Sequence, residues 1–489
     1  MTVPEISAPV TTVSTLPTAT STKVYSYVRQ SPVTSTSFQA TLENGRGDHN
    51  GRVSVQPTGF EGGLLVGLYD PHLGPQCAEY LQQHLVPILD ESLSTQLDHS
   101  DDDHHHNTNT CKIDPIQVID TLKSTFKELD ELLLATAITV ALTQPESTNE
   151  PPPEGELKKT QEVLAQVVTG STALVGFLAP HTIAASGSDA ATGAELNESS
   201  ADGVQKHDLY LAQLGDAVAI LAGYDAQGQW TTRRLNPPET HEHSVRYSGS
   251  EEYRRVVLEA KERALTVEQF LTQHNGSSTS NNQSTDIEIG DNSFLTRNGR
   301  FLGLPVTRAF GDLDWKMEQE ARFSVATLVE KSLRLRIDKA LGGGQEENGA
   351  SSSHDETGIN NLNDPPYVTA DPRISRFVLE TRKPQSRSSV GGASDQLLVF
   401  LNRASLYTTA AVANQTSSTG SAKYNPYDQA LLSDFDLSRV VANALEKGEE
   451  NCALALANAL NLDRRVTGAV VDKEGDEEGL EGSIIVVAL

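Results

Sequence analysis

Apolar residues fall into short runs along this chain, and the spacing within each run indicates the element that it forms. Residues 63–69 (GLLVGLY) form a continuous apolar run that is typical of a buried strand. Runs of the same character lie at 172–178, 209–214, 217–221, 397–401 and 484–489. Gly215 and Asp216 separate two of these runs, and this dipeptide predicts a hairpin between them.

Helical spacing appears between the strand-like runs. Apolar side chains recur at helical intervals over residues 74–89, although Pro87 predicts a kink or an end there. Between Ile116 and Leu133 they recur every three or four residues, which predicts an amphipathic helix. Residues 253–274 and 437–460 also have helical patterns. Strands joined by tight turns, with helices in blocks, favour an α+β layered sandwich over a βαβ arrangement.

Polar segments of low complexity interrupt these elements. Each is rich in Ser, Asn, Gly, Pro or acidic residues, and buries too little apolar surface to offset the entropy of ordering. They lie near 98–106, 143–155, 186–203, 275–292, 342–361 and 384–394. The stretches between them are too short to fold alone. We therefore expect a disordered lead-in over residues 1–22 and a single domain over 23–489 with these insertions.

Charge and cysteine content exclude several classes of function. The 489 residues carry 38 Lys and Arg against 66 Asp and Glu, a net charge of -28. This balance disfavours a nucleic-acid partner and an anionic membrane surface. Three scattered cysteines make no disulfide framework and indicate a reducing compartment. No apolar run is long enough to cross a bilayer, so we expect a soluble intracellular protein with no membrane span.

A series of short blocks carries the candidate chemistry. In chain order they read LLVGLYDPHLG (64–74), GSTA (170–173), LYLAQLGDAVAIL (209–221), LPVTRAFGDLDWK (304–316), YVTADP (367–372), DQLLVFLNRASLY (395–407) and GLEGSIIVVAL (479–489). This order resembles the signature blocks of the PPM (type 2C) family of metal-dependent protein serine/threonine phosphatases. The resemblance runs from about Asp48 to Leu489. The TRAFGD block and the NCALALANALNL segment (451–462) resemble the pyruvate dehydrogenase phosphatase branch.

The resemblance implies a four-layer α/β/β/α sandwich with two mostly antiparallel sheets. It also implies that two Mg²⁺ or Mn²⁺ ions, bridged by a hydroxide, attack the phosphorus of phosphoserine or phosphothreonine. Two such hard cations need several carboxylate oxygens as ligands. By resemblance, the Asp70 carboxylate bridges both ions, and the Pro71 carbonyl replaces that of a glycine that binds metal. His72 matches the residue that protonates the leaving hydroxyl.

Further site residues follow from the same resemblance. Asp216 matches an aspartate associated with an additional, weaker metal, although the turn interpretation competes with it. Asp48 matches the aspartate of an N-terminal acidic pair, with Gly47 in the place of its glutamate. Arg46 and Arg52 are the early candidates for a phosphate contact. Elsewhere, Arg308 and Asp312 are interpreted as structural partners rather than catalysts.

Departures from the family pattern concentrate at the expected metal site. Arg403 stands where the family has an aspartate that binds the metal pair, and Leu406 and Tyr407 replace a tryptophan and an acid. Glu481 and Gly482 stand where the family has Asp followed by Asn or Asp. An arginine in place of an anion changes the local charge by two units and cannot lose its proton.

The charge change predicts that the site has lost its metal ions. At an effective dielectric near 20, a unit charge pair about 4 Å apart is worth roughly 4 kcal/mol. A divalent cation carries twice the unit charge, so its repulsion by Arg403 is correspondingly larger than this value. We expect Arg403 to displace the metal and to pair with Asp70, and also with Glu481. If the alignment slips by one or two positions, Arg403 is instead a surface residue at a strand end.

Three hypotheses remain open. The first is a pseudophosphatase with a regulatory or binding role, which retains no Mg or Mn at its main binuclear site. The second is an active Mg²⁺- or Mn²⁺-dependent phosphatase of the pyruvate dehydrogenase phosphatase type. The third is a structural subunit without phosphate affinity. By resemblance alone, the partner is a phosphoprotein, kinase or dehydrogenase complex and the location is the mitochondrial matrix, with the cytoplasm as the alternative.

Overall fold

The structure is a computed structural model that describes residues 21–28, 36–43, 51–59, 63–98, 114–143, 154–181, 204–225, 227–236, 252, 255, 304, 306–326, 328–329, 333, 366–382, 396–402, 434–446, 456, 459 and 483–488. Its strands form two antiparallel sheets, which we call sheet I and sheet II. The only isolated bridge between described residues outside the strands, Arg308 with Thr369, is parallel.

Sheet I is a 6-stranded sheet that combines both ends of the chain. Its order is β1 (Ser21–Val28), β2 (Thr36–Glu43), β12 (Ser483–Ala488), β11 (Gln396–Leu401), β7 (Val218–Tyr224) and β8 (Trp230–Arg234). The predicted apolar runs 397–401 and 484–489 form β11 and β12, which lie side by side at the centre of this sheet.

Sheet II contains strands that are almost completely buried, such as β5 (Gly170–Pro180). Its order is β10 (Arg373–Arg382), β6 (Val204–Leu214), β5 (Gly170–Pro180), β4 (Leu64–His72) and β3 (Arg52–Pro57), and the short β9 (Phe310–Gly311) also pairs with β5. The run 63–69 forms most of β4, in the interior of the sheet, which explains why it is apolar without alternation.

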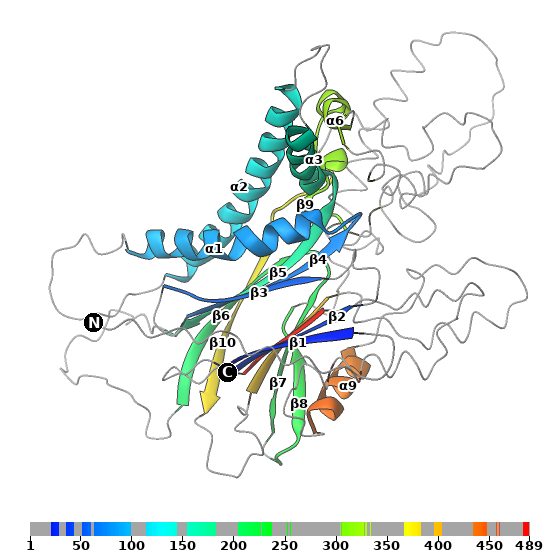
Figure 1. Ribbon diagram of the computed structural model, residues 1–489. Helices are drawn as coiled ribbons and strands as arrows, with labels where there is room; N and C mark the ends of the chain where they lie inside the picture. The colour runs from blue at the N-terminus through cyan, green and yellow to red at the C-terminus, as the bar shows by residue number, and fades with distance from the viewer. Residues whose placement is uncertain are drawn as a thin grey trace, which may run out of the picture.

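Helices cover the outer face of each sheet. The helices α1 (Gln76–Asp98), α2 (Pro115–Leu142) and α3 (Glu154–Val168) lie over sheet II, and α9 (Asp434–Glu446) lies on the far side of sheet I (Figure 1). The short helices α5 (Leu313–Lys316) and α6 (Gln319–Ala326) follow β9. This four-layer α/β/β/α sandwich with two antiparallel sheets confirms the predicted fold class.

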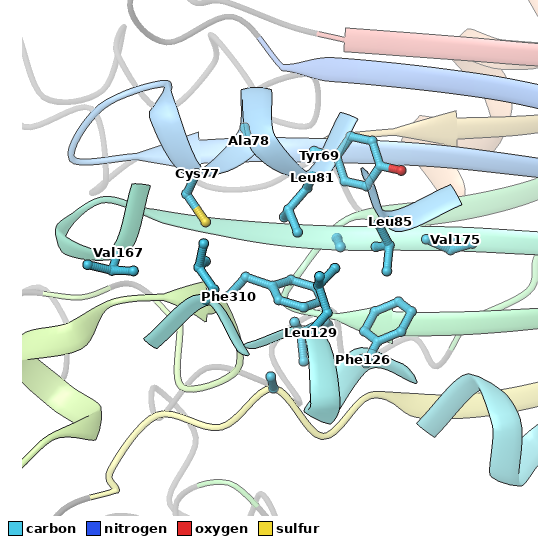
Figure 2. Packing of buried hydrophobic residues seen from close by; sticks show 14 of the residues in the cluster. Tyr69, Cys77, Ala78, Leu81, Leu85, Phe126, Leu129, Val167, Val175 and Phe310 are labelled. Atoms are coloured by element: carbon cyan, nitrogen blue, oxygen red, sulfur yellow. The ribbon is translucent and has the colours of Figure 1, made fainter. Parts of the chain in front are cut away.

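Side chains of the central strands alternate between two apolar layers. On β4, Leu65 and Tyr69 pack against the helices, whereas Val66 and Leu68 pack between the sheets. Figure 2 shows the helix-side layer, where side chains of α1, α2 and β5 point toward one another. A third apolar cluster joins sheet I to α9. Asp70 and Asn402 lie at one end of the layer between the sheets.

Two sequence predictions are corrected by these elements. Gly215 and Asp216 do not form a hairpin, because β6 pairs with β5 and β10 whereas β7 pairs with β11 and β8 in the other sheet. The turn therefore carries the chain from sheet II to sheet I, with Gly215 at φ 105. Pro87 does not end α1, since burial of Val86 and Leu89 on either side of it holds the helix together.

Other predictions fall largely beyond the described ranges. Of the predicted helix 253–274 only residue 255 is described, and α9 covers the first part of 437–460. β1 begins at Ser21, two residues before the expected domain boundary, and α3 begins at Glu154, inside the segment 143–155. Among the described helices, none has the length and apolar character required of a membrane span.

Candidate functional site

The strand register brings one end of every central strand together. In sheet II, the end of β4 lies opposite the start of β5, with His72 paired to Gly170. The end of β6 lies at the same place, with Leu214 paired to Ala173. β3 begins here as well, because Arg52 pairs with Tyr69. This end of sheet II therefore presents Asp70, Pro71 and His72.

Sheet I places its candidate residues at the same end of the sandwich. Leu401 at the end of β11 pairs with Val218 at the start of β7 and with Ile484 near the start of β12. The turn at Asp216 joins this end of sheet I to sheet II. Arg403, two positions after Leu401, and Glu481, two positions before β12, lie outside the described residues.

The N-terminal candidates follow the same topology. β2 ends at Glu43, on the side where it pairs with the start of β12, and β3 starts at Arg52. Arg46 and Asp48 are in the segment between these two strand ends and are outside the described residues. Among the described residues, the start of β3 and the end of β2 lie at this end of the two sheets.

Three polar side chains close the apolar layer between the sheets at this end. Asp70 continues the series of Val66 and Leu68, and Asn402 continues the series of Leu398 and Phe400, both of which face between the sheets. Thr172 lies directly across from Asp70 in the register of β4 and β5. The alternation that builds the core therefore also aims these three side chains at a common space.

Asn402 makes the contact that defines this space. Its side-chain Nδ2 donates a hydrogen bond of 3.1 Å to Oδ1 of Asp70. Asn402 is fully buried, whereas Asp70 is half-buried. The Ser171 hydroxyl also donates to the Asp70 backbone carbonyl, at 3.4 Å. The carboxylate expected to bridge two metal ions thus has an amide donor from sheet I on one of its oxygens.

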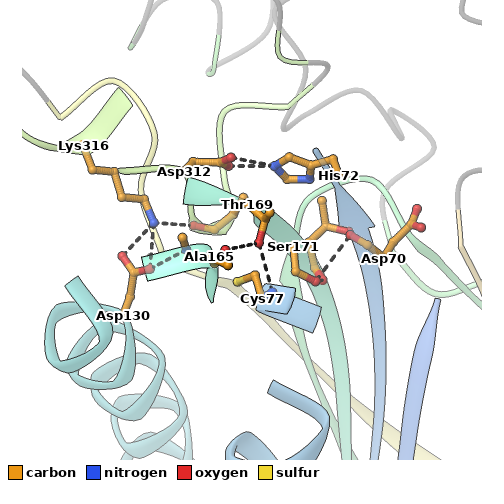
Figure 3. A network of polar contacts seen from close by, with 12 residues as sticks. Asp70, His72, Cys77, Asp130, Ala165, Thr169, Ser171, Asp312 and Lys316 are labelled. Atoms are coloured by element: carbon orange, nitrogen blue, oxygen red, sulfur yellow. Dashed lines mark hydrogen bonds and ion pairs between the residues drawn. The ribbon is translucent and has the colours of Figure 1, made fainter. Parts of the chain in front are cut away.

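His72 is held by a buried carboxylate. Its Nε2 lies 2.9 Å from Oδ1 and 2.8 Å from Oδ2 of Asp312 (Figure 3). The Asp312 side chain is 0% exposed, and that of His72 is 14% exposed. An ionised carboxylate only accepts hydrogen bonds, so the His72 Nε2–H group is the donor of the hydrogen bond to Asp312. The other ring nitrogen, Nδ1, is left for chemistry outside this pair.

Backbone strain surrounds the His72–Asp312 pair. Leu73 (φ 64) and Asp312 (φ 54) are the non-glycine residues with positive φ in the described part of the chain. Aspartate tolerates this region, but a branched apolar residue such as leucine rarely adopts it. Gly170 lies beneath the pair, where a Cβ atom would overlap both the His72 ring and the Asp312 carboxylate. The local structure is therefore built around this contact.

A buried ion pair between Lys316 and Asp130 holds the backbone next to Asp312. Lys316 Nζ lies 2.8 Å and 2.7 Å from the two carboxylate oxygens of Asp130 on α2, and donates to the Ala309 carbonyl at 2.7 Å (Figure 3). Asp130 Oδ1 also accepts from the Gly311 backbone N–H at 2.9 Å. Burial raises the pKa of Asp130, and Lys316 together with the Gly311 N–H offsets part of this rise.

Cys77 lies beside this network but has no reactive character. It is fully buried, and its backbone N–H donates to Thr169 Oγ1 at 3.1 Å. Burial raises the pKa of the Cys77 thiol well above its usual value, and the nearby Asp312 and Asp130 charges raise it further. The thiol therefore stays protonated at neutral pH, and it packs in the helix-side layer.

Asp216 and Pro71 are both buried at this end of the sheets. Asp216 is 4% exposed and follows Gly215, where a Cβ atom would overlap the Thr172 side chain. Pro71 pairs with Ser171, beyond the last residue of β4 that pairs with β3, so its missing N–H falls where the sheet narrows. The metal roles of both residues stay predictions.

Two arginines singled out from the sequence have structural partners. Arg308 donates from Nε to Glu252 Oε1 at 2.7 Å and from Nη1 to the Asp371 carbonyl at 2.7 Å, as expected for a structural residue. Glu252 is buried and also accepts from the Thr307 hydroxyl at 2.6 Å. The Arg52 guanidinium forms an ion pair with the carboxylate of Glu79 on α1, at 2.7 Å.

The described donor set does not fit a pair of Mg²⁺ or Mn²⁺ ions. Such ions require several carboxylate or carbonyl oxygens each. In the described ranges no three His, Cys, Asp or Glu side chains come together as metal ligands. Asp70 supplies one carboxylate, but an amide N–H faces its Oδ1, and the His72 Nε2 faces Asp312. The described residues therefore supply too few oxygen ligands for two such ions.

Sequence reasoning missed two contacts of this site. Asn402 was not singled out, although its place after alternating Leu398 and Phe400 predicts that it faces between the sheets. Asp312 was interpreted as structural, and its pairing with His72 joins positions 240 residues apart. The TRAFGD block marked Asp312, but its partner depends on the short β9 strand that pairs with β5.

Comparisons with known proteins give a general likeness. No protein-family model matches the chain, and no curated protein matches it. A phosphatase from a pathogenic strain of Toxoplasma gondii is 13% identical, with 96% of this chain and 95% of that chain covered and a TM-score of 0.40. A serine-threonine phosphatase 2C from Toxoplasma gondii is 13% identical, with 98% of each chain covered and a TM-score of 0.37.

A sex determining protein of C. elegans is also similar. It is 14% identical, with 94% of this chain and 65% of that chain covered and a TM-score of 0.38. At these identities and TM-scores, the likenesses support no conclusion about activity. The strand order and register of the chain itself define its architecture.

Proposed function

We propose that this chain is a PPM-type phosphatase homologue that binds phosphorylated protein without hydrolysing it. The proposal combines the ordered motif blocks with the four-layer fold and with the site at one end of its two sheets. The expected partner is a phosphoserine- or phosphothreonine-containing segment of a kinase or dehydrogenase complex. That partner and a location in the mitochondrial matrix come from the resemblance alone and stay predictions.

The hydrogen bond from Asn402 to Asp70 carries the proposal. It joins the end of β11 to the end of β4, so the DQLLVFLNRASLY block meets the LYDPH block at the site as the resemblance requires. Arg403 is the next residue after Asn402. This supports the alignment that gives Arg403 the position of a metal-binding aspartate.

Charge then favours a binding role over catalysis. A guanidinium near Asp70 neutralises the carboxylate that a metal pair needs and repels each divalent ion. Without the ions there is no activated hydroxide to attack phosphorus. A cationic side chain at this place is instead suited to a phosphate group, which arginine binds through paired hydrogen bonds. Arg46 is a further candidate for the same phosphate.

One observation favours the alternative, an active phosphatase. The His72–Asp312 pair is intact, buried and strained, as a pair that positions a proton donor would be. An active enzyme would use Asp70, His72 and Asp216 with a reduced metal set that includes Asp48 and Glu481. The same pair also suits a phosphate-binding site, since the imidazole contacts a leaving group or a bound phosphate equally well.

Phosphate release separates the two functions. The full-length protein, incubated with millimolar Mn²⁺ and a phosphothreonine peptide, is expected to release no phosphate above the Asp70→Ala control. The same protein is expected to bind the phosphopeptide, measured by fluorescence anisotropy, more tightly than the unphosphorylated peptide. Mn²⁺-dependent turnover that Asp70→Ala abolishes would establish the active enzyme. Equal affinity for both peptides would establish the structural-subunit hypothesis instead.

Arg403→Asp tests the residue assignment. Restoring an acid at this position is expected to strengthen Mn²⁺ binding, because it changes the local charge by two units in favour of the cation. Arg52→Asp is the matched control, since Arg52 belongs to an ion pair with Glu79. If Arg403→Asp and Arg52→Asp change the Mn²⁺ affinity equally, Arg403 does not occupy the metal-binding position.

A further inference from the structure

We infer that Asn402 is an intramolecular substitute for a cation at Asp70, so that residue 402 excludes metal ions independently of Arg403. The inference rests on the proposed function and deepens it, because it names a second determinant of the non-catalytic site. The observation is the 3.1 Å hydrogen bond from Asn402 Nδ2 to Asp70 Oδ1. A carboxylate that bridges two ions needs lone pairs on both of its oxygens, and the Asn402 N–H engages one of the lone pairs of Oδ1.

The position of Asn402 is fixed by the core of the protein. Leu398 and Phe400 precede it on the same face of β11 and are buried between the sheets. Asn402 itself is 0% exposed. A buried amide donor must be satisfied within the protein, because water does not reach it. Turning the amide away from Asp70 to admit a cation would therefore cost a hydrogen bond in a place where no solvent replaces it.

Thr172 places a further oxygen atom near the Asp70 carboxylate. Its side chain is 4% exposed, and its Oγ1 has no hydrogen-bond partner among the described residues. It lies across from Asp70 in the register of β4 and β5. Side chains paired in this way have Cβ atoms about 5 Å apart. The Thr172 hydroxyl thus lies near the Asp70 carboxylate, to which Asn402 donates a hydrogen bond.

These three positions suggest how a cation site would be recreated. Asn402→Asp keeps the shape of the side chain and replaces the amide with a second carboxylate next to Asp70. Two carboxylates and the Thr172 hydroxyl supply oxygen ligands of the kind that Mn²⁺ and Mg²⁺ prefer. Like charges this close repel each other unless a cation lies between them. The variant is therefore expected to gain Mn²⁺ affinity and to depend on Mn²⁺ for its stability.

The experiment measures Mn²⁺ affinity of the full-length protein by electron paramagnetic resonance. Asn402→Asp is expected to bind Mn²⁺ at least about 10-fold more tightly than the wild type, because a second carboxylate then faces the cation. Its melting temperature is expected to rise on addition of Mn²⁺. Asp70→Asn in the Asn402→Asp background is expected to abolish both effects, since one carboxylate of the pair is then lost.

Asn236→Asp is the matched control. Asn236 is also buried, at 3% exposure, but its amide group bonds to backbone atoms of Ala217 and Ala219 rather than to a carboxylate. It is expected to lose stability without gaining Mn²⁺ affinity. An equal gain in both Asn→Asp variants would overturn the inference, because the effect would then come from added negative charge alone.

Asn402→Ser provides a second test of the inference if Asn402→Asp does not fold. Serine removes the amide and leaves a smaller hydroxyl, so Mn²⁺ affinity in the Arg403→Asp background is expected to rise further when Asn402→Ser is added. A folded Asn402→Ser variant with unchanged affinity in that background would also overturn the inference. Failure of the proposed function is recognised separately, by Mn²⁺-dependent phosphate release from the wild-type protein.

Discussion

Replacing Asp130 with asparagine is expected to be among the most destabilising single changes in this protein. The substitution keeps the size of the side chain and an oxygen for the Gly311 N–H, but removes the charge that faces Lys316. Lys316 Nζ then keeps its hydrogen bond to the Ala309 carbonyl but has lost the negative charge that it faces. Both partners are buried, at 5% and 8% exposure, so solvent screens little of the loss.

The magnitude follows from the burial of the pair. Removing one partner of a buried, hydrogen-bonded ion pair costs about 3–5 kcal/mol, because the other charge is left uncompensated. Domains are stable by only about 5–15 kcal/mol, so the loss is a large share of the total. Asp130 also holds Gly311, the residue before Asp312. The change is therefore expected to loosen the His72–Asp312 contact as well as the fold.

Guanidinium unfolding followed by tryptophan fluorescence measures this effect. The chain has two tryptophans, and Trp315 is fully buried next to Lys316, so it reports directly on this region. Glu162→Gln is the control, because Glu162 pairs with Lys158 on the exposed surface of α3 at 3.9 Å and is expected to cost less than about 0.5 kcal/mol. A loss in Asp130→Asn no larger than this control would refute the assigned role of the buried pair.

Two further predictions concern other buried positions. Burial lowers the pKa of His207 in the folded state, so the unfolded chain takes up its proton first and the free energy of unfolding falls as the pH drops below about 6.5. His207→Gln is expected to reduce this dependence of the unfolding free energy on pH, measured by urea titrations at several pH values. An unchanged pH dependence would exclude His207 as its source. Gly170→Ala is expected to cost about 1–3 kcal/mol, because its Cβ overlaps His72 and Asp312. Gly155→Ala in α3, where a Cβ meets no atom within 4 Å, is its control, and equal denaturation midpoints would contradict the overlap.

The sequence predicts this fold best where strands and helices are most completely buried. The runs that became β4, β5 and β11 are continuous and apolar because each lies inside a sheet with both faces covered. Strand β10 was not predicted. It lies at an edge of sheet II, where residues such as Arg373 and Val378 face solvent, and so it carries a mixed pattern.

Local patterns do not reveal which strands pair. The Gly215–Asp216 turn has the composition of a hairpin, but its flanking strands pair in different sheets. The site depends on the same long-range pairing. Asp70 and His72 were identified from the motif blocks, whereas Asn402 and Asp312 became visible as their partners only through the register of β11 and β9. The roles of Arg403, Asp48 and Glu481 stay predictions.

The number of Mn²⁺ ions held per chain tests the central claim most directly. Wild-type protein and Asp70→Ala, titrated side by side with Mn²⁺ and monitored by electron paramagnetic resonance, are expected to bind the ion equally weakly. That result would show that Asp70 no longer supports a binuclear site. Two tightly bound Mn²⁺ ions per wild-type chain, both lost in Asp70→Ala, would contradict the account.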